Sequence, residues 1–337
     1  ETVDTIVAKL LGAESPVLMT SYLGRNAGAV ATLDELARFA GIRVFEPSPV
    51  HLNIPRNSPC FGGFMPGKAL ATADVGLLVD VDVPWIPRDT PESASTWWAH
   101  IDVDCLKRGT PMWNFPSHLR VEGASERILA QILAGLKARA TDAFKSAAAA
   151  RVKTFESEHA ARAKALAADA AKKGSPGQVN AAYFCAELNR ALGEDDIVVN
   201  EAVRNFPTVA NNVMRTRPGS FYGLAGGGLG FSGGMALGLK LAHPGKTVVQ
   251  VCGDGVFYFS NPQASLATAK KYGLAYLAVV LDNTGWSAVK EATLRVYPAG
   301  EAQAIESFEA NLAPDMDFGK VAEAAGGYGE QVSDPEA

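Results

Sequence analysis

The chain alternates short apolar runs, rich in Val and Leu, with longer stretches of helical periodicity. Apolar runs of strand length lie at Pro16–Ser21, Arg43–Pro47, Val75–Val81 and Ala99–Val103. Helical stretches lie at Ala27–Ala40, which Gly41 closes, and at Ser125–Ala138. Alternation of this kind is typical of a parallel sheet with helices on both faces. We therefore predict an α/β first domain over residues 1–140.

The next segment, residues 141–177, is dense in Ala, Lys, Arg and Glu and has no Gly or Pro before Gly174. These strong helix formers predict a helical connector, and the GSPG sequence that ends it indicates a domain boundary. A second α/β domain, residues 178–337, then begins with a predicted helix at Val179–Leu192 and a strand at Ile197–Asn200. We expect a loop from Glu201 to Gly219, and a helix-poor region beyond Lys290 that leads to a last helix at Phe318–Ala325. The predicted fold class is α/β, with two doubly wound parallel-sheet domains.

Within the second domain, the apolar run Thr247–Cys252 predicts a buried strand that ends at Gly253-Asp254-Gly255. A helix beginning near Asn261-Pro262 and ending at Gly273 leads to another predicted strand, Tyr276–Leu281. If the two strands are parallel, Asp254 and Asn283 both follow carboxyl ends and can approach one point. Carboxylate and amide oxygens beside a Gly-rich turn suit Mg²⁺ that carries a phosphorylated ligand.

Composition excludes several classes of partner. The 337 residues are 47% hydrophobic and 20% charged, enough to bury substantial cores, and the net charge of −5 offers no basic surface for nucleic acid or anionic membrane. The four cysteines are scattered and form no CxxC pair, so neither a zinc site nor a disulfide framework is indicated. The absence of a long apolar run or a signal-like start leads us to expect a cytoplasmic protein that binds no membrane.

A second glycine cluster, residues 226–234, precedes this stretch. Its Gly228-x-Gly230-x-x-Gly233 spacing fits a dinucleotide fingerprint with Asp254 as the ribose-binding acid. Such a fingerprint needs an apolar strand running directly into the first glycine, and the preceding residues RTRPGSFYGLA do not read as one. Two other interpretations stay open: the glycines let backbone N–H groups approach a phosphate, or they serve only close packing.

The two clusters together resemble the diphosphate-binding domain of thiamine-diphosphate enzymes. That motif begins with GDG and ends with an Asn-containing pair; here 26 residues separate Gly255 from Asp282-Asn283. A GGLGF segment precedes the motif. The resemblance is to the acetolactate synthase-like and benzoylformate decarboxylase-like group, and it extends over residues 1–140, which look like that group's central domain.

This resemblance implies roles for particular residues. Asp254, the side chain of Asn283 and the backbone oxygen of Gly285 would bind Mg²⁺. Leu229 would lie under the thiazolium ring and keep the cofactor bent, and Trp286 together with Phe257 would supply an apolar wall; Leu229 and Trp286 are thus the catalytic candidates. The implied cofactor-binding set is Gly227, Gly228, Leu229, Gly253, Asp254, Gly255, Val256, Asn283, Gly285 and Trp286.

The same resemblance implies decarboxylation or carboligation of a small-molecule 2-oxo acid or acyl substrate. Val289 stands where pyruvate decarboxylases have a catalytic Glu, which disfavours simple aldehyde release. The family's pyrimidine-binding domain, with its activating Glu, is absent from residues 1–337, so we expect another chain or segment to supply it within a homo- or hetero-oligomer, a dimer or tetramer. Alternatives are a 2-hydroxyacyl-CoA lyase of the same fold and a non-catalytic cofactor-binding subunit. FAD is compatible with the first domain, but no residue supports it.

Six further polar residues are weaker candidates. His100, on a predicted strand, is interpreted as structural, and His51 and Asn53, in the irregular loop of the first domain, as facing substrate or solvent. Glu201, after the strand IVVN, would contact substrate or cap a loop. Arg215 and Arg217 would bind an anion or lie on the surface.

Overall fold

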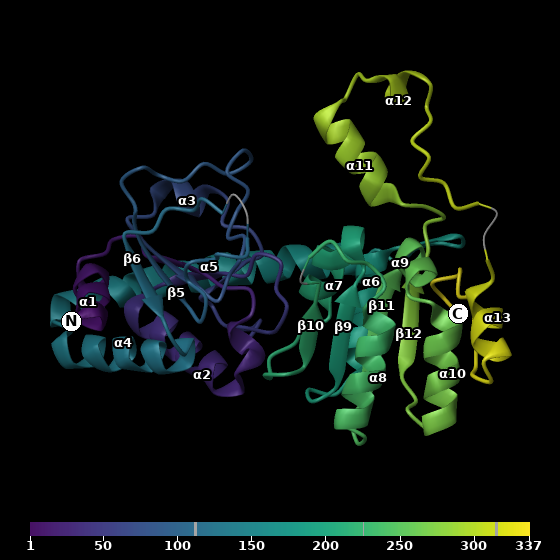
Figure 1. The fold of residues 1–337 in the computed structure, drawn as a ribbon, viewed down its shortest axis with the longest axis horizontal. Helices are drawn as coiled ribbons and strands as arrows, with labels where there is room; N and C mark the ends of the chain where they lie inside the picture. Colours follow the sequence, from purple (N-terminus) through teal and green to yellow (C-terminus); the bar gives the residue numbers. More distant parts are fainter. Residues whose placement is uncertain (111–112, 225, 314–315) are drawn as a thin grey trace. The chain divides into compact units, whose positions relative to one another are not determined.

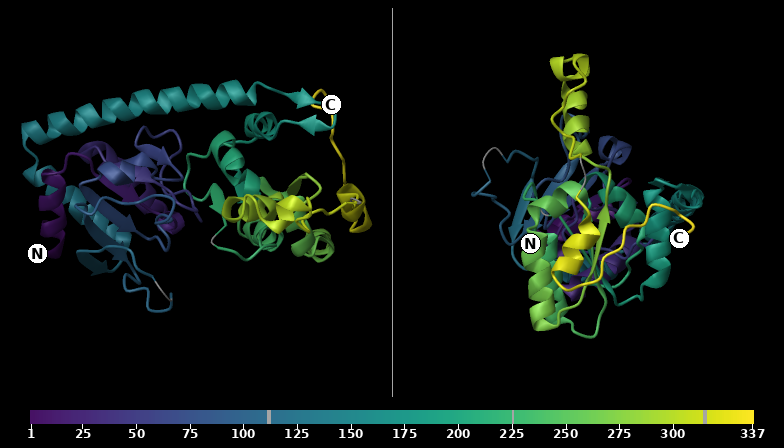
Figure 2. Two further views of the ribbon diagram at one scale, coloured as in Figure 1. Left: turned by 90° about the horizontal axis from the view of Figure 1, so that it is seen from above. Right: turned by 90° about the vertical axis from the view of Figure 1, so that its right-hand side faces the viewer.

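A computed structural model describes residues 1–110, 113–224, 226–313 and 316–337. The chain divides into two compact units. Unit 1 contains Glu1–Ala165 and Arg215–Ser220, and unit 2 contains Leu166–Met214 and Phe221–Ala337. The division falls within a single long helix (Figure 2), α5 (Asp142–Ala170), in the segment predicted to be a helical connector. The three-part division drawn from the sequence stays a prediction.

Unit 1 is built on a parallel six-stranded sheet of order β3-β2-β1-β4-β5-β6. One face packs against α1, α2 and α4 through residues such as Leu18, Leu77 and Ile101, and the other packs against α3 and Trp85. The elements are α1 (Thr2–Leu11), β1 (Val17–Met19), α2 (Ala27–Ala40), β2 (Arg43–Phe45), β3 (Phe61–Gly63), α3 (Lys68–Thr72), β4 (Val75–Val79), β5 (Trp97–Asp102), β6 (Leu119–Glu122) and α4 (Ser125–Arg139).

Unit 2 is built on a parallel four-stranded sheet of order β10-β9-β11-β12 (Figure 1). Alternate residues of β11 face opposite helical layers: Val249 and Val251 pack toward α6 and α7, whereas Val248 packs against α8. The elements are α6 (Ala181–Ala191), β9 (Ile197–Glu201), α7 (Phe206–Asn212), β10 (Phe221–Gly223), α8 (Ser232–Ala242), β11 (Val248–Gly253), α9 (Asp254–Phe259), α10 (Pro262–Tyr272), β12 (Leu277–Leu281), α11 (Ser287–Val296), α12 (Glu301–Ala304) and α13 (Phe318–Ala324). The predicted fold class is confirmed. Across the described residues, no helix combines the length and apolarity needed to cross a membrane.

Helix ends follow local chemistry closely. The α2 helix ends at a left-handed Gly41 (φ 61°), and α10 begins at Pro262 and ends at a left-handed Gly273 (φ 65°). One expectation for the connecting segments is wrong: the expected loop after Glu201 contains α7, which starts beside a proline and buries Val209. The described residues between Lys290 and Phe318 contain the end of α11 and the short α12, and most of them are not helical, as expected. No residue of α11 is buried, so its helix formers, rather than core packing, account for it.

A buried charge network holds the carboxyl ends of β4 and β5 together. Lys107 Nζ donates to Asp102 (2.8 Å) and to Asp82 (2.7 Å), and the Tyr22 hydroxyl donates to the same Asp102 oxygen (2.6 Å). Burial alone would raise the pKa of Asp102, but contacts with His100, Lys107 and Tyr22 outweigh it and hold that pKa below its ordinary value of 3.8. The network therefore stabilises unit 1 above this pH, and the stabilisation is lost as the pH falls further.

We predict that Lys107→Met lowers the free energy of unfolding by about 3 kcal/mol, because Asp102 is left as a buried charge without its cation. Urea denaturation at pH 7 measures this loss. The matched control is Lys137→Met, which removes an exposed ion pair with Glu35 and should cost no more than about 1 kcal/mol. Equal losses in the two variants would contradict the assigned role of the network.

Candidate functional site

The carboxyl ends of β11 and β12 lie side by side in unit 2. The strands pair in parallel, with Gly253 opposite Leu281, so Asp254 and Asp282 leave the sheet together. The juxtaposition of the two turns predicted from the sequence is thus present. Asp254 also starts helix α9, directly at the end of its strand.

The Asp254 carboxylate bridges these two turns. It is buried; one of its oxygens accepts a hydrogen bond from the Gly255 N–H (2.8 Å) and the other from the Gly285 N–H (2.7 Å). Burial raises the pKa of Asp254, and the nearby Asp282 carboxylate raises it further, while the two N–H donors oppose the shift. A divalent cation bound by Asp254 would offset this unfavourable charge.

The remaining predicted metal ligands lie in the second turn. Asn283 is exposed, and its side-chain nitrogen donates to Ser287 Oγ (3.0 Å), which leaves the orientation of its amide set by the start of α11. Gly285 forms an antiparallel bridge with Asn311, and the Trp286 N–H donates to the Ala310 carbonyl (2.8 Å). No three His, Cys, Asp or Glu side chains in the described ranges gather as a metal site, so an ion here would rely on amide and carbonyl oxygens beside Asp254.

The glycines of the 226–234 cluster serve two different purposes. A Cβ added at Gly226, Gly227 or Gly228 would meet no atom of the described residues within 4 Å, and all three are exposed. At Gly230 a Cβ would lie 2.7 Å from the Phe259 carbonyl group, and the backbone is left-handed (φ 93°). Close packing therefore explains Gly230, whereas the first three glycines leave their backbone open to a ligand.

Glu201 holds the turn between the open glycines and α8. It ends β9 with its side chain fully buried, and its two oxygens accept hydrogen bonds from the N–H groups of Gly230 (2.6 Å) and Ser232 (2.9 Å). Of the two roles considered from the sequence, the structure supports the cap of a loop. Leu229 directly precedes Gly230 in this turn, and with 38% of its surface exposed it is not part of the core.

Trp286 lies directly over the GDG turn. A Cβ at Gly255 would fall 2.0 Å from the indole Cδ1, so only glycine fits beneath the ring. The indole Nε1 is buried and has no hydrogen-bond partner among the described residues. A buried donor without a partner is costly, and a bound acceptor would satisfy it. Phe257, the other proposed wall, packs in the core against Phe318, with 5.1 Å between ring centroids.

A short strand does precede the glycine cluster, but it does not run directly into the first glycine of the fingerprint spacing. Strand β10 ends at Gly223, five residues before Gly228. The topology supplies a further reason against a dinucleotide fingerprint. In a dinucleotide fold the fingerprint strand adjoins the strand that carries the acidic residue, whereas β10 is an edge strand and β9 separates it from β11. Asp254 is therefore not placed as a ribose-binding acid.

The other polar candidates belong to unit 1. The buried Asn53 side-chain amide links neighbouring backbone segments: it accepts a hydrogen bond from the Gly24 N–H (2.8 Å) and donates to the carbonyls of Ser21 and His51. His100 is buried and stacks on Trp113, with 5.1 Å between ring centroids, which fits its structural interpretation. Arg215 is buried and its carbonyl accepts from the Arg56 N–H (3.2 Å), while Arg217 is exposed.

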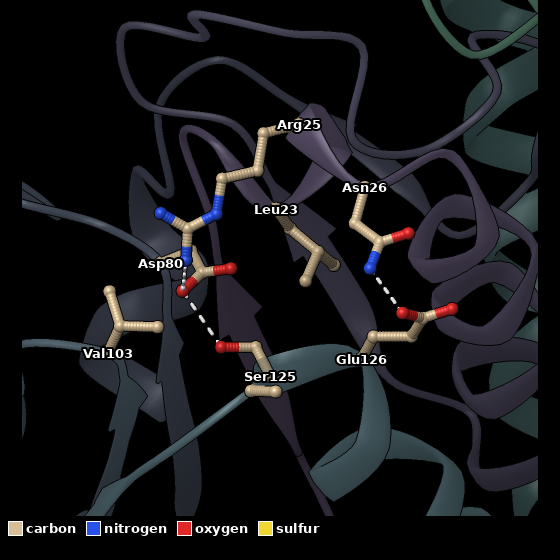
Figure 3. A pocket seen from close by; sticks show the side chains of 8 residues that line it. Leu23, Arg25, Asn26, Asp80, Val103, Ser125 and Glu126 are labelled. Atoms are coloured by element: carbon tan, nitrogen blue, oxygen red, sulfur yellow. Dashed lines mark hydrogen bonds and ion pairs between the residues drawn. The ribbon is translucent and has the colours of Figure 1, made fainter.

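A cavity of about 210 Å³ lies where β1 and β4 end in unit 1 (Figure 3). Its polar lining is already paired: Asp80 accepts from Arg25 (3.2 Å) and Ser125 (2.8 Å), and Asn26 donates to Glu126. Pockets for drug-sized ligands begin at about 300 Å³. The cavity gives no support for FAD, and all predicted cofactor residues belong to unit 2.

Sequence reasoning missed how Glu201 and Trp286 use their polar atoms. The signal for Glu201 was a charged residue at the end of the buried strand that begins Ile197-Val198-Val199, because a buried charge must find donors. No local signal marks the unpartnered nitrogen of Trp286, since its surroundings come from a turn 31 residues earlier in the chain, counted from Gly255 to Trp286.

Comparisons with known proteins agree with this geometry. Residues 205–337 match the family described as "Thiamine pyrophosphate enzyme, C-terminal TPP binding domain". The acetolactate synthase large subunit of Haemophilus influenzae is 36% identical over 110 residues, which cover 33% of this chain and 18% of that protein. The acetolactate synthase large subunit IlvG of Mycobacterium tuberculosis is 33% identical over 152 residues, or 44% of this chain and 26% of that protein.

The fold of the whole chain also matches a solved structure. A thiamine diphosphate-dependent 4-hydroxybenzoylformate decarboxylase from Rhodococcus jostii RHA1 has a TM-score of 0.76 at 20% identity, covering 99% of this chain and 59% of that one. At this identity the likeness establishes the fold alone. The sequence matches confirm the predicted resemblance to thiamine-diphosphate enzymes of the acetolactate synthase type, and the solved structure confirms the fold. The chain spans only part of the length of these relatives.

We predict that Gly230→Ala lowers the free energy of unfolding by about 2 kcal/mol or more, because the new Cβ meets the Phe259 backbone at a left-handed position. Gly228→Ala is the matched control and should change that free energy by no more than about 0.5 kcal/mol. Chemical denaturation of both variants measures the difference. Similar losses would show that the glycines do not divide into packed and open positions.

Proposed function

We propose that this chain carries the diphosphate-binding side of a thiamine-diphosphate- and Mg²⁺-dependent enzyme that decarboxylates or ligates 2-oxo acids. The observation that carries the proposal is the Asp254 carboxylate, which bridges the GDG turn and the Gly285 turn at the end of a parallel sheet. The family match of residues 205–337 supports the cofactor. The acetolactate synthase relatives support the substrate class.

The residues present fit a diphosphate with its magnesium ion. Open backbone at Gly227 and Gly228 offers N–H donors to phosphate oxygens, and the unpartnered Trp286 Nε1 is a further donor beside Gly255. Asp254, the Asn283 amide oxygen and the Gly285 carbonyl would hold Mg²⁺, with phosphate and water oxygens completing its octahedron. Gly253, Gly255 and Val256 complete the lining of the proposed cofactor site.

Thiamine diphosphate, when bound, supplies a nucleophilic carbon and takes up the electron pair released as carbon dioxide leaves. The chain's own contribution is position and exclusion of water. Leu229 would support the reacting ring from the turn that Glu201 holds, and Trp286 would shield that ring from solvent, which favours loss of charge from the substrate carboxylate. Val289, 51% exposed on α11, supplies no proton, so protonation of the product is left to other groups.

The proposed enzyme requires polypeptide beyond residues 1–337. Its pyrimidine side, including the activating carboxylate, would come from another chain or segment, and the active enzyme would be a homo- or hetero-oligomer. Native mass spectrometry of the protein with its partners tests this part of the proposal. A monomer of this chain alone that turns over 2-oxo acids would contradict it.

We predict that Asp254→Ala weakens Mg²⁺-dependent binding of thiamine diphosphate by at least about 100-fold, because removing a metal ligand should cost no less than removing an outer-shell partner. Isothermal titration calorimetry on the complete enzyme measures the affinity. Asp282→Asn is the control, because it keeps a polar side chain at the neighbouring strand end, and should change the affinity by less than about tenfold. An unchanged affinity in Asp254→Ala would refute the metal assignment.

A second prediction separates binding from chemistry. Leu229→Ala should leave the affinities for Mg²⁺ and thiamine diphosphate nearly unchanged, yet slow proton exchange at the thiazolium carbon by about 10- to 100-fold, because the reacting groups lose their alignment. Exchange is followed by NMR after acid quenching. Leu241→Ala, at an exposed leucine of α8, is the control and should exchange at the wild-type rate. A wild-type rate in Leu229→Ala would remove its proposed role.

A further inference from the structure

We infer that Glu201 is a positioning residue that fixes the Leu229 turn from beneath and excludes phosphate from the start of α8. This inference rests on the proposed function, because its consequence is felt through the cofactor. The evidence is the pair of hydrogen bonds that the Gly230 and Ser232 N–H groups donate to Glu201. Gly230 directly follows Leu229 in the chain.

The position of Glu201 in the sheet explains why its carboxylate can do this. It ends β9 opposite Cys252 of β11, one residue before the GDG turn begins. Alternation along β9 points Asn200 toward α7, where its side-chain nitrogen donates to the Phe206 carbonyl (3.0 Å), and points Glu201 toward α8. The carboxylate therefore reaches the amino end of an 11-residue helix, where negative charge is stabilised.

The same turn is also held from two other directions. The space beside Gly230 is closed by the backbone of Phe259 and Ser260 at the end of α9, and Gln250 Nε2 donates to Ser232 Oγ (2.8 Å) from the middle of β11. Because α9 begins at Asp254, the turn that carries Leu229 abuts the element that carries the proposed metal ligand. Glu201 thus sets the position of Leu229 relative to Asp254.

Glu201 also decides where an anion can bind. The N–H groups of Gly230 and Ser232 are the ones that a phosphate at the start of α8 would use, and a buried carboxylate already accepts both. Its negative charge opposes a second anion at that place. The diphosphate is therefore directed to the open backbone at Gly227 and Gly228, ahead of Leu229 in the chain.

The test compares Glu201→Gln with Asn200→Asp, two isosteric exchanges at adjacent, equally buried positions that face opposite layers. In Glu201→Gln, an NH₂ group replaces one acceptor, so we expect amide hydrogen exchange of Gly230 and Ser232 to accelerate at least about tenfold in the cofactor-free full chain. In the complete enzyme, the affinity of Glu201→Gln for thiamine diphosphate should fall about tenfold, and proton exchange at the thiazolium carbon should be slower than in the wild type. Asn200→Asp should leave these three quantities within about twofold, whatever its effect on Tm.

Every outcome bears on the inference. Unchanged amide exchange of Gly230 and Ser232 in Glu201→Gln, or an equal acceleration in Asn200→Asp, would overturn it. If Glu201→Gln does not fold, Glu201→Asp carries the test: it keeps the charge but is shorter by one methylene, and exchange between wild-type and fully unprotected values is expected. Failure of the wild-type enzyme to bind thiamine diphosphate would refute the proposed function, while the exchange of the cofactor-free chain would still report on Glu201.

Discussion

A buried carboxylate at the end of β11 is the interaction on which the candidate site depends. Asp254 accepts one N–H from its own turn and another from the turn after β12, so a single side chain joins two segments that the sequence keeps 31 residues apart, from Asp254 to Gly285. Burial and the neighbouring Asp282 both raise the pKa of this group. The arrangement is electrostatically unfavourable as it stands, and a divalent cation would relieve it.

A second buried carboxylate, Glu201, accepts hydrogen bonds from the backbone of the glycine-rich turn. Asp254 has neighbours that suit a cation, whereas Glu201 is enclosed by N–H donors at a helix amino end. Glu201 ends β9 and Asp254 directly follows the adjacent strand β11, so the two acids lie at the same edge of one sheet but have different hydrogen-bond partners.

Unit 1 offers a contrast in how buried charge is used. Its acidic strand ends are neutralised internally by Lys107 and Arg25, and the cavity between β1 and β4 is lined by side chains that already pair with one another. In unit 2 the glycines Gly226–Gly228 are open, and the Trp286 Nε1 donor has no partner among the described residues, so hydrogen-bond donors remain for a ligand. The chemical difference between these two sheet edges, more than the similarity of their folds, points to unit 2 as the cofactor-binding side.

Local chemistry determined much of this protein from its sequence alone. The ends of α2 and α10 follow from Gly41, Pro262 and Gly273, because left-handed glycines and a first-turn proline act within a few residues. The GDG turn and the Asn283 turn could be paired because parallel strands bring their carboxyl ends to one edge. Only the tertiary structure decided that Gly230 is packed while Gly228 is open, that Glu201 caps a turn some 30 residues later, and that Trp286 covers Gly255. Each of those outcomes depends on which atoms from distant segments occupy the same space, and no periodicity or turn preference along the chain encodes that.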